Sequence, residues 1–164
     1  MIAKKEARNT NFIFMVGNDR QLSFSVQTSN VADVNMSPAY WPTGPKRIKY
    51  PDNTVEQVPL VIDMLVSEDM NEWIEIYKWI MDCKNTNNGL DKAKPCFLQV
   101  LDSQNKPGVT FRYSDAFPID LSGLQYVTTE DGSRILTVTC SLEYNQFSIE
   151  LPSGEIIDES YVTE

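Results

Sequence analysis

The sequence lacks the residues on which most enzymatic chemistry depends. None of its 164 residues is a histidine, which removes the commonest general base, the commonest metal ligand and any Ser-His or Cys-His nucleophile pair. The glycines are scattered singly, and neither G-x-x-x-x-G-K-[ST] nor G-x-G-x-x-G occurs, so no phosphate-binding loop is indicated. We therefore expect a protein that is not an enzyme and has no catalytic residues, no cofactor and no metal.

Acidic side chains are the remaining candidates for chemistry. Four of them crowd one short segment: Glu68, Asp69, Glu72 and Glu75. They could hold a cation, but acids at the start of a helix are favoured by the helix dipole, and we prefer that interpretation. The loop from Asp102 to Gly108 lacks the alternating acids and the final glutamate of a calcium site. Any chain with 23 acids offers carboxylate pairs, but nothing marks out two of them, so a hydrolase is the least supported alternative.

Two groups of aromatic residues could bind a ligand or a partner. One group is set among prolines between residues 28 and 59, beside three cations: Tyr40, Trp41, Lys46, Arg47, Lys49 and Tyr50. Aromatic residues and arginine are enriched at interfaces, so this segment is either a protein contact patch or a plain loop that folds back on the domain. The second group is Trp73, Tyr77 and Trp79. It could stack on a sugar, as in a sugar-binding or small-molecule-binding β-barrel, but its helical spacing favours the core or a subunit interface.

Length, charge and cysteine content limit which classes of protein this chain can belong to. The length fits one domain, and the net charge of −9 argues against capture of nucleic acid. The cysteines are Cys83, Cys96 and Cys140, an odd number without a C-x-x-C pair, which favours buried thiols in a reducing compartment. The apolar runs are too short for a signal peptide or a membrane span. We expect neither export by that route nor a membrane location.

Most of the chain is predicted to be β-structure, because apolar and polar residues alternate. Residues 11–16 and 22–27 form a predicted hairpin about Gly17, and residues 96–101 and 109–113 form a second. Residues 124–129 and 134–144 form a third about Asp131 and Gly132. The strand 60–66 is apolar on both sides, so it is predicted to be central and covered on both faces. The segment 28–59 holds five prolines and is predicted to be irregular.

One helix is predicted over residues 69–83, with Ser67 or Asp69 as its N-cap. One face of the last long strand carries small hydroxyl side chains. Such a face suits a sheet that lines a space or lies against another surface. From Glu150 onward four more acids and no Lys or Arg follow, so residues 149–164 are predicted to be a flexible acidic tail after a single β domain over residues 1–148.

Four stretches carry a family resemblance. Residues 59–82 read PLVIDMLVSEDMNEWIEIYKWIMD, a strand followed by a helix that begins with acids, continues with aromatics and ends in W-[IV]. The basic residues of KRIKYPDN precede it, and AFPIDLSGLQY and LTVTCSLEYNQF follow. With the order of elements, they resemble the tail-tube protein family of contractile-tailed phages, including tube-associated proteins of T-even-like myoviruses. The resemblance covers residues 11 to 148.

The resemblance implies a mainly β fold, a barrel or sandwich with one flanking helix. It implies a hexameric ring in the virion tail, made in the host cytoplasm, whose rings stack through the long loop and whose lumen carries DNA without binding it. We then expect inner-facing residues of the long strands to include more acids than bases, because an acidic lining does not bind phosphate. Both aromatic groups and the three cations become candidate ring contacts.

The resemblance leaves the position in the tail open. The acidic extension after Phe147 fits a capping role, so we favour the tail completion protein, the terminator of the tube at its head-proximal end. The alternatives are the repeating tube subunit, the baseplate initiator, or a secretion-system tube or other virion β protein. Expected partners are the adjacent tube ring and sheath or head-neck proteins.

Overall fold

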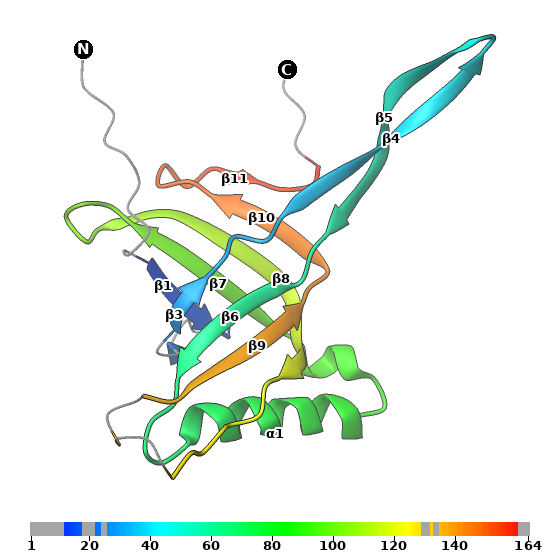
Figure 1. Ribbon diagram of the computed structural model, residues 1–164. Helices are drawn as coiled ribbons and strands as arrows, with labels where there is room; N and C mark the ends of the chain where they lie inside the picture. The colour runs from blue at the N-terminus through cyan, green and yellow to red at the C-terminus, as the bar shows by residue number, and fades with distance from the viewer. Residues whose placement is uncertain (1–11, 18–21, 24–25, 129–131, 133–134, 161–164) are drawn as a thin grey trace.

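The computed structural model describes residues 12–17, 22–23, 26–128, 132 and 135–160. Among these residues nine strands form one antiparallel sheet in the order β2-β1-β7-β8-β9-β6-β3, with β10 and β11 attached beside β8 (Figure 1). β4 and β5 form a separate two-stranded ribbon. The strands are β1 Phe12–Val16, β2 Leu22–Ser23, β3 Val26–Ser29, β4 Val34–Thr43, β5 Lys46–Gln57, β6 Leu60–Leu65, β7 Lys94–Leu101, β8 Pro107–Leu121, β9 Thr137–Glu143, β10 Gln146–Glu150 and β11 Ile156–Ile157.

The strand β8 connects two layers of the sheet. Its first part pairs with β7 and β10, and its last part, from Phe117 to Leu121, pairs with β9. Asp115 lies between the two parts in a left-handed backbone conformation, with φ of 53°. Figure 1 shows β6 and β9 in a layer in front of β7 and the first part of β8. The predicted fold class, mainly β with one flanking helix, is confirmed.

The core lies between these layers and follows the predicted alternation. Along β9, Val138, Cys140 and Leu142 are buried, and their neighbours are not. Tyr113 of β8 is fully buried and meets Tyr144 edge to face, with ring centres 4.9 Å apart. Its hydroxyl oxygen accepts a hydrogen bond from the backbone N–H of Ala32, 3.3 Å away. This bond supplies a polar partner that a buried phenol needs.

The helix α1 spans Asn71–Asn85, and a short 3-10 helix, η1, follows at Gly89–Lys92. The predicted N-cap is wrong, because Met70 occupies the cap in a left-handed conformation without a side-chain bond. Instead the carboxylate of Glu72 accepts hydrogen bonds from the N–H and the hydroxyl of Ser67, at 3.0 and 2.8 Å. Burial raises the pKa of Glu72, but these bonds outweigh it and lower the pKa below its usual range.

Two of the predicted hairpins are confirmed. β1 pairs with β2, and β7 pairs with β8. The single strand predicted over residues 22–27 is two strands in the structure. β2 pairs with β1, whereas β3 pairs with β6 in the other layer. Asn11, the turn residues 18–21 and residues 24–25 lie outside the described residues.

The third predicted hairpin is wrong. Residues 124–128 form no strand, and β9 begins only at Thr137. β9 pairs instead with β6 and with the end of β8, which are distant in sequence. Local turn chemistry predicted a nearby partner, but burial of the apolar face of β9 selects a distant one. Of the predicted turn, Gly132 is described, while Asp131 and residues 129 and 134 are not.

The segment predicted as a free acidic tail is in part a piece of the sheet. Ile149 and Glu150 end β10, opposite Phe111 and Thr110 of β8. Ile156 and Ile157 form β11 against β10. The acids of this segment predicted a solvated tail, but the apolar residues between them allow it to pair with the sheet. Residues 161–164 lie outside the described residues.

The largest correction concerns residues 28–59. Most of this segment is a long β-hairpin, β4 and β5, that projects from the body (Figure 1). Pro38 and Pro42 lie in β4 and Pro51 lies in β5. A two-stranded ribbon has two open edges, so a missing N–H can point away from the partner strand and costs no ladder bond. Prolines therefore did not exclude strands here.

Candidate subunit interface

The β4–β5 hairpin has two chemically different faces. Residues directly opposite in an antiparallel pair point to the same side. Trp41 lies opposite Ile48, and Ala39 opposite Tyr50, so these four share one apolar face. The other face carries the remaining aromatic residue and two cations: Tyr40 opposite Lys49, and Pro42 opposite Arg47.

Both faces of the hairpin are exposed. Trp41 is 62% exposed and Ile48 is 56% exposed, although each could fill a core position. Trp41 and Tyr50 meet edge to face at 6.3 Å, and Lys49 lies 6.0 Å from the ring centre of Tyr40. These contacts order the side chains within the hairpin but remove little of their surface from water. Exposed apolar surfaces of this kind are typical of interaction sites, so the hairpin remains a candidate interface.

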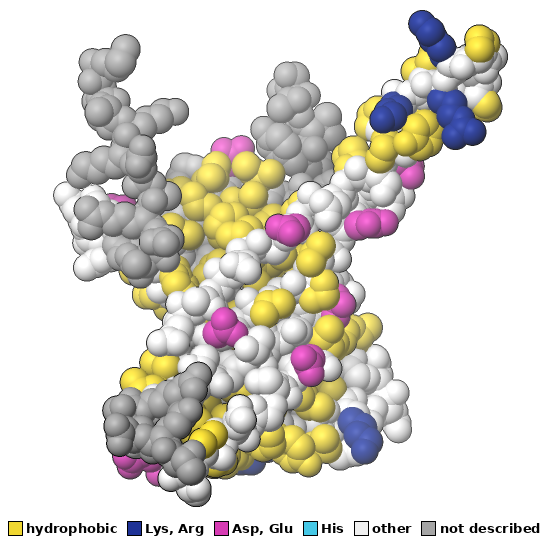
Figure 2. Space-filling view, viewed as in Figure 1, with side chains coloured by type: hydrophobic (Ala, Val, Ile, Leu, Met, Phe, Trp, Pro, Cys, Tyr) yellow, Lys and Arg dark blue, Asp and Glu magenta, His cyan; other side chains and the backbone are white. Residues whose placement is uncertain are grey.

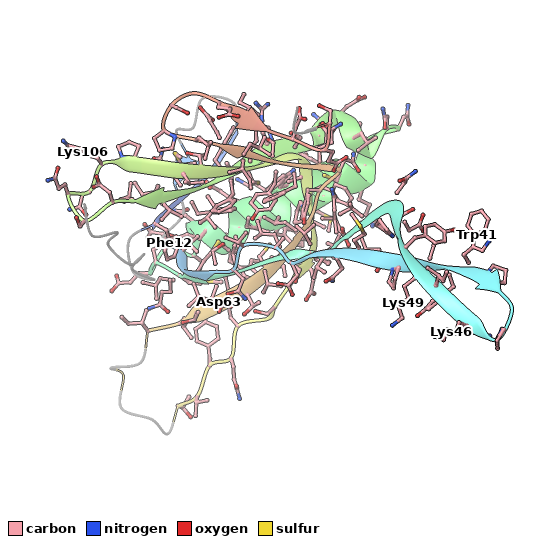
Figure 3. The ribbon with its side chains drawn as sticks, turned by 90° about the horizontal axis from the view of Figure 1, so that it is seen from above. Phe12, Trp41, Lys46, Lys49, Asp63 and Lys106 are labelled. Carbon is pink, nitrogen blue, oxygen red and sulfur yellow. The ribbon has the colours of Figure 1, made fainter. Side chains whose placement is uncertain are left out.

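Lys46, Arg47 and Lys49 gather at the far end of the hairpin, whereas acids lie lower on the hairpin and over the body (Figure 2). Figure 3 shows Trp41, Lys46 and Lys49 well away from Asp63 of the body. The six hairpin residues predicted from the sequence are thus brought together in one place.

The three aromatic residues of α1 lie elsewhere and are not equivalent. Trp79 is buried, and its indole N–H donates to the carbonyl of Lys92 at 2.8 Å, so it belongs to the core of this chain. Trp73 stacks on Tyr77 with ring centres 5.4 Å apart, and its N–H donates to the carbonyl of Ser122. Tyr77 is exposed. Of this group, Trp73 and Tyr77 remain candidates for a contact between subunits.

One face of the front layer is uncovered, which corrects the prediction that residues 60–66 are covered on both sides. Val61 is 40% exposed, whereas its neighbours Leu60 and Ile62 are buried. The register places the polar residues of β9 on the same open face as Val61 and Asp63. On this face the described residues include three acids and no Lys or Arg: Asp63, Asp120 and Glu143.

A hydrogen-bonded triad crosses this open face. The hydroxyl of Thr28 donates to one carboxylate oxygen of Asp63 at 2.5 Å, and the hydroxyl of Thr139 donates to the other at 2.6 Å. The triad joins β3, β6 and β9. The sequence predicted a small polar face on the last long strand but not the contacts of Asp63, because the three strands meet only in the folded chain.

The apolar face of the rear layer is also open toward one end. Phe14, Leu98 and Tyr113 are buried, but further along the same strands the residues of this face are only half-buried: Phe12, Val100, Phe111 and Ile149. Figure 2 shows a continuous apolar area there, beside the base of the hairpin. We call these four residues the rear patch.

Other kinds of site have little support in the described part of the chain. It contains no group of three or more His, Cys, Asp or Glu side chains placed to hold a metal ion. No described helix is both long and apolar enough to span a membrane. The three cysteines are free, with Cys96 and Cys140 buried. Of the three aromatic residues on α1, Trp79 is buried and Trp73 stacks on Tyr77, so only Tyr77 is exposed enough to stack on a sugar.

Comparison with known proteins supports the resemblance. No family model matches the sequence. The chain is 26% identical over 166 aligned positions to the tail tube terminator protein of Enterobacteria phage T4, an alignment that covers 94% of each chain. Among solved structures it is similar to the tube-terminating cap of the anti-feeding prophage, at TM-score 0.73 and 16% identity, with 92% and 95% of the two chains covered.

A second solved structure has the same fold. The sheath/tube terminator of the extracellular contractile injection system PVC superposes with TM-score 0.74 at 15% identity, covering 90% of this chain and 99% of the other. At such identities the structures establish the fold. The resemblance to tail-tube proteins is confirmed, and the curated relative is a tube terminator.

Proposed function

We propose that this chain is a structural, non-enzymatic subunit that ends the tube of a contractile phage tail. The observation that carries the proposal is the similarity to the T4 tail tube terminator over 94% of both chains. The two solved terminators share the fold over nearly their whole length. An alignment of this extent covers both the body and the hairpin.

The subunit acts in a hexameric ring. Within the monomer, the described residues leave three surfaces uncovered: the hairpin, the open face of β6 and β9, and the rear patch. Soluble monomers rarely expose several such surfaces, and closure into a ring protects sheet edges and apolar faces together. Neighbouring tube and sheath proteins are the partners on either side of the ring.

The open face of β6 and β9 lines the channel. Its three acids and lack of cations repel phosphate, so DNA passes without adhering. The triad around Asp63 holds one of these carboxylates in place. This supports the expectation that residues facing the lumen carry more acids than bases.

The test is assembly. Purified protein is expected to form rings in native mass spectrometry and negative-stain images, and to stop elongation when added to growing tubes of the cognate tube subunit. Growth of the protein alone into long tubes would favour the repeating subunit. A strict monomer at high concentration, with no effect on tube growth, would contradict the proposal.

A further inference from the structure

The β4–β5 hairpin is joined to the body through two short linkers. Residues 30–33 connect β3 to β4, and residues 58–59 connect β5 to β6; neither linker forms a strand. Among the described strands, β4 and β5 pair only with each other, so no strand pairing ties the hairpin to the body. Short segments of this kind can absorb changes in φ and ψ and act as hinges. The angle at which the hairpin projects in Figure 1 therefore depends on other contacts.

Each linker is bound by the hydroxyl of a buried tyrosine. The backbone N–H of Ala32, in the first linker, donates to the hydroxyl oxygen of Tyr113 at 3.3 Å. The hydroxyl of Tyr144 donates to the carbonyl oxygen of Val58, in the second linker, at 3.0 Å. The two rings meet edge to face with centres 4.9 Å apart, and both are buried. These two side chains, which we call the tyrosine pair, thus hold both ends of the hairpin.

The bond from Ala32 is shielded from water. Between residues 30 and 38 every residue is exposed except Ala32, which is 7% exposed and packs in the core. A hydrogen bond in such surroundings is stronger than one in water, and a backbone N–H left there without a partner is costly. The bond to Tyr113 therefore favours one position of the first linker.

The second linker is stiffer than the first. Pro59 has a fixed φ and restricts Val58 to extended backbone. The amide of Gln57 also donates to a carboxylate oxygen of Glu159 at 2.6 Å, although this bond is exposed to solvent. Residues 30–33 contain no proline. The first linker therefore depends more on its tyrosine than the second linker does.

We propose that Tyr113 and Tyr144 are positioning residues, which hold the β4–β5 hairpin at one angle to the body before the subunit meets a partner. A buried phenol needs some polar partner, but here both partners are backbone groups of the linkers, far from the tyrosines in sequence. A hairpin fixed in advance loses less conformational freedom on binding than one that swings. The effect on assembly rests on the proposed function, whereas the hold on the hairpin is a property of the single chain.

The distance between two spin labels tests the hold on the hairpin. One label is attached at Ile48→Cys in the hairpin and the other at Lys78→Cys in α1, because both sites are exposed. Cys83→Ser removes the half-buried native thiol, and Cys96 and Cys140 are buried. Folded, dilute monomer is measured, so that each distance lies within one chain. The protein with both tyrosines is expected to give one narrow distance distribution.

Removal of the hydroxyls should broaden this distribution. Tyr113→Phe keeps the ring and removes the bond to Ala32, so we expect a wider distribution, a smaller effect of Tyr144→Phe and the largest effect in the double variant. Tyr77→Phe is the matched control, because it removes the hydroxyl of an exposed tyrosine and should change nothing. A folded double variant with a distribution as narrow as that of the unchanged protein, or equal broadening in the control, would overturn the proposal.

Hydrogen exchange gives a second measurement on the single variants. In Tyr113→Phe the amide of Ala32 is expected to exchange about tenfold faster, because its acceptor is gone, while the amides of β6 and β9 keep their protection. Tyr144→Phe removes a donor to a carbonyl and should leave the exchange of Ala32 nearly unchanged. Equal acceleration at Ala32, β6 and β9 would show a general loss of stability and would contradict a positioning role.

Assembly measurements separate this proposal from the proposed function. If the hairpin of the double variant has the correct angle for about a tenth of the time, the protein concentration for half-assembly should rise about tenfold or more. Equal assembly of the unchanged protein and a double variant with a broadened distribution would overturn the role of the tyrosine pair in assembly. Absence of rings from the unchanged protein would count against the proposed function, whereas the distances and exchange rates would still test the hold on the hairpin.

Discussion

The body and the β4–β5 hairpin are both antiparallel β-structure, yet they are stabilised differently. Each long strand of the body buries one face, as Leu60, Ile62 and Met64 do in β6. The hairpin buries neither face, and its large apolar residues are exposed. An isolated two-stranded ribbon is only marginally stable in water. The difference indicates that the body is stabilised by its own core, whereas the exposed hairpin is the part for which we propose a partner.

Truncation of a buried aromatic side chain should have the largest effect on the stability of the body. Tyr113→Ala removes a fully buried ring that contacts Tyr144 and Phe147. We expect the free energy of unfolding to fall by about 3–5 kcal/mol, because a large cavity is left in the core. Urea denaturation followed by circular dichroism measures the loss. A loss below about 1 kcal/mol would mean that the layers close over the gap.

Alkaline pH should lower the free energy of unfolding of the body by a smaller amount than Tyr113→Ala does. Burial raises the pKa of Tyr113 to about 12 and that of Cys140 to about 12. The unfolded chain releases these protons from about pH 9 to 10, so the stabilisation is complete below pH 9 and is lost as the pH rises toward 12. For Tyr113 this amounts to roughly 2–3 kcal/mol.

The matching variant is Tyr113→Phe, which keeps the ring and removes the ionisable group. Its stability should fall less steeply between pH 10 and 12 than that of the unchanged protein, measured by denaturation at each pH. Equal slopes would show that other groups cause the alkaline loss.

The smallest effect on folding is expected in the hairpin. Trp41→Ala should change the free energy of unfolding of the monomer by less than about 0.5 kcal/mol, because the side chain is largely exposed. The same variant should weaken ring assembly by tenfold or more, since buried tryptophans dominate interface energies. Denaturation of dilute protein and native mass spectrometry separate the two effects. A large loss of monomer stability would show that the hairpin, like the body, is stabilised by its own packing.

Local patterns in the sequence determined which face of each long strand enters the core. Alternation along residues 136–144 predicted the buried face of β9, because side chains alternate across a strand whatever its partner is. Helical spacing with early acids predicted α1 in the same way. The absence of histidine led only to the expectation of no catalytic residues, and the quoted stretches carried the resemblance to tail-tube proteins.

Strand partners and surfaces were decided only by the tertiary structure. β9 pairs with β6 rather than with a neighbour across Asp131 and Gly132, since burial of its apolar face outweighs a local turn signal. The prolines of residues 28–59 suggested irregular structure, but a ribbon with two open edges accommodates them. Asp63 meets Thr28 and Thr139 only after three distant strands have come together. Exposure is a property of the packed chain, so the uncovered surfaces could not be read from a local pattern.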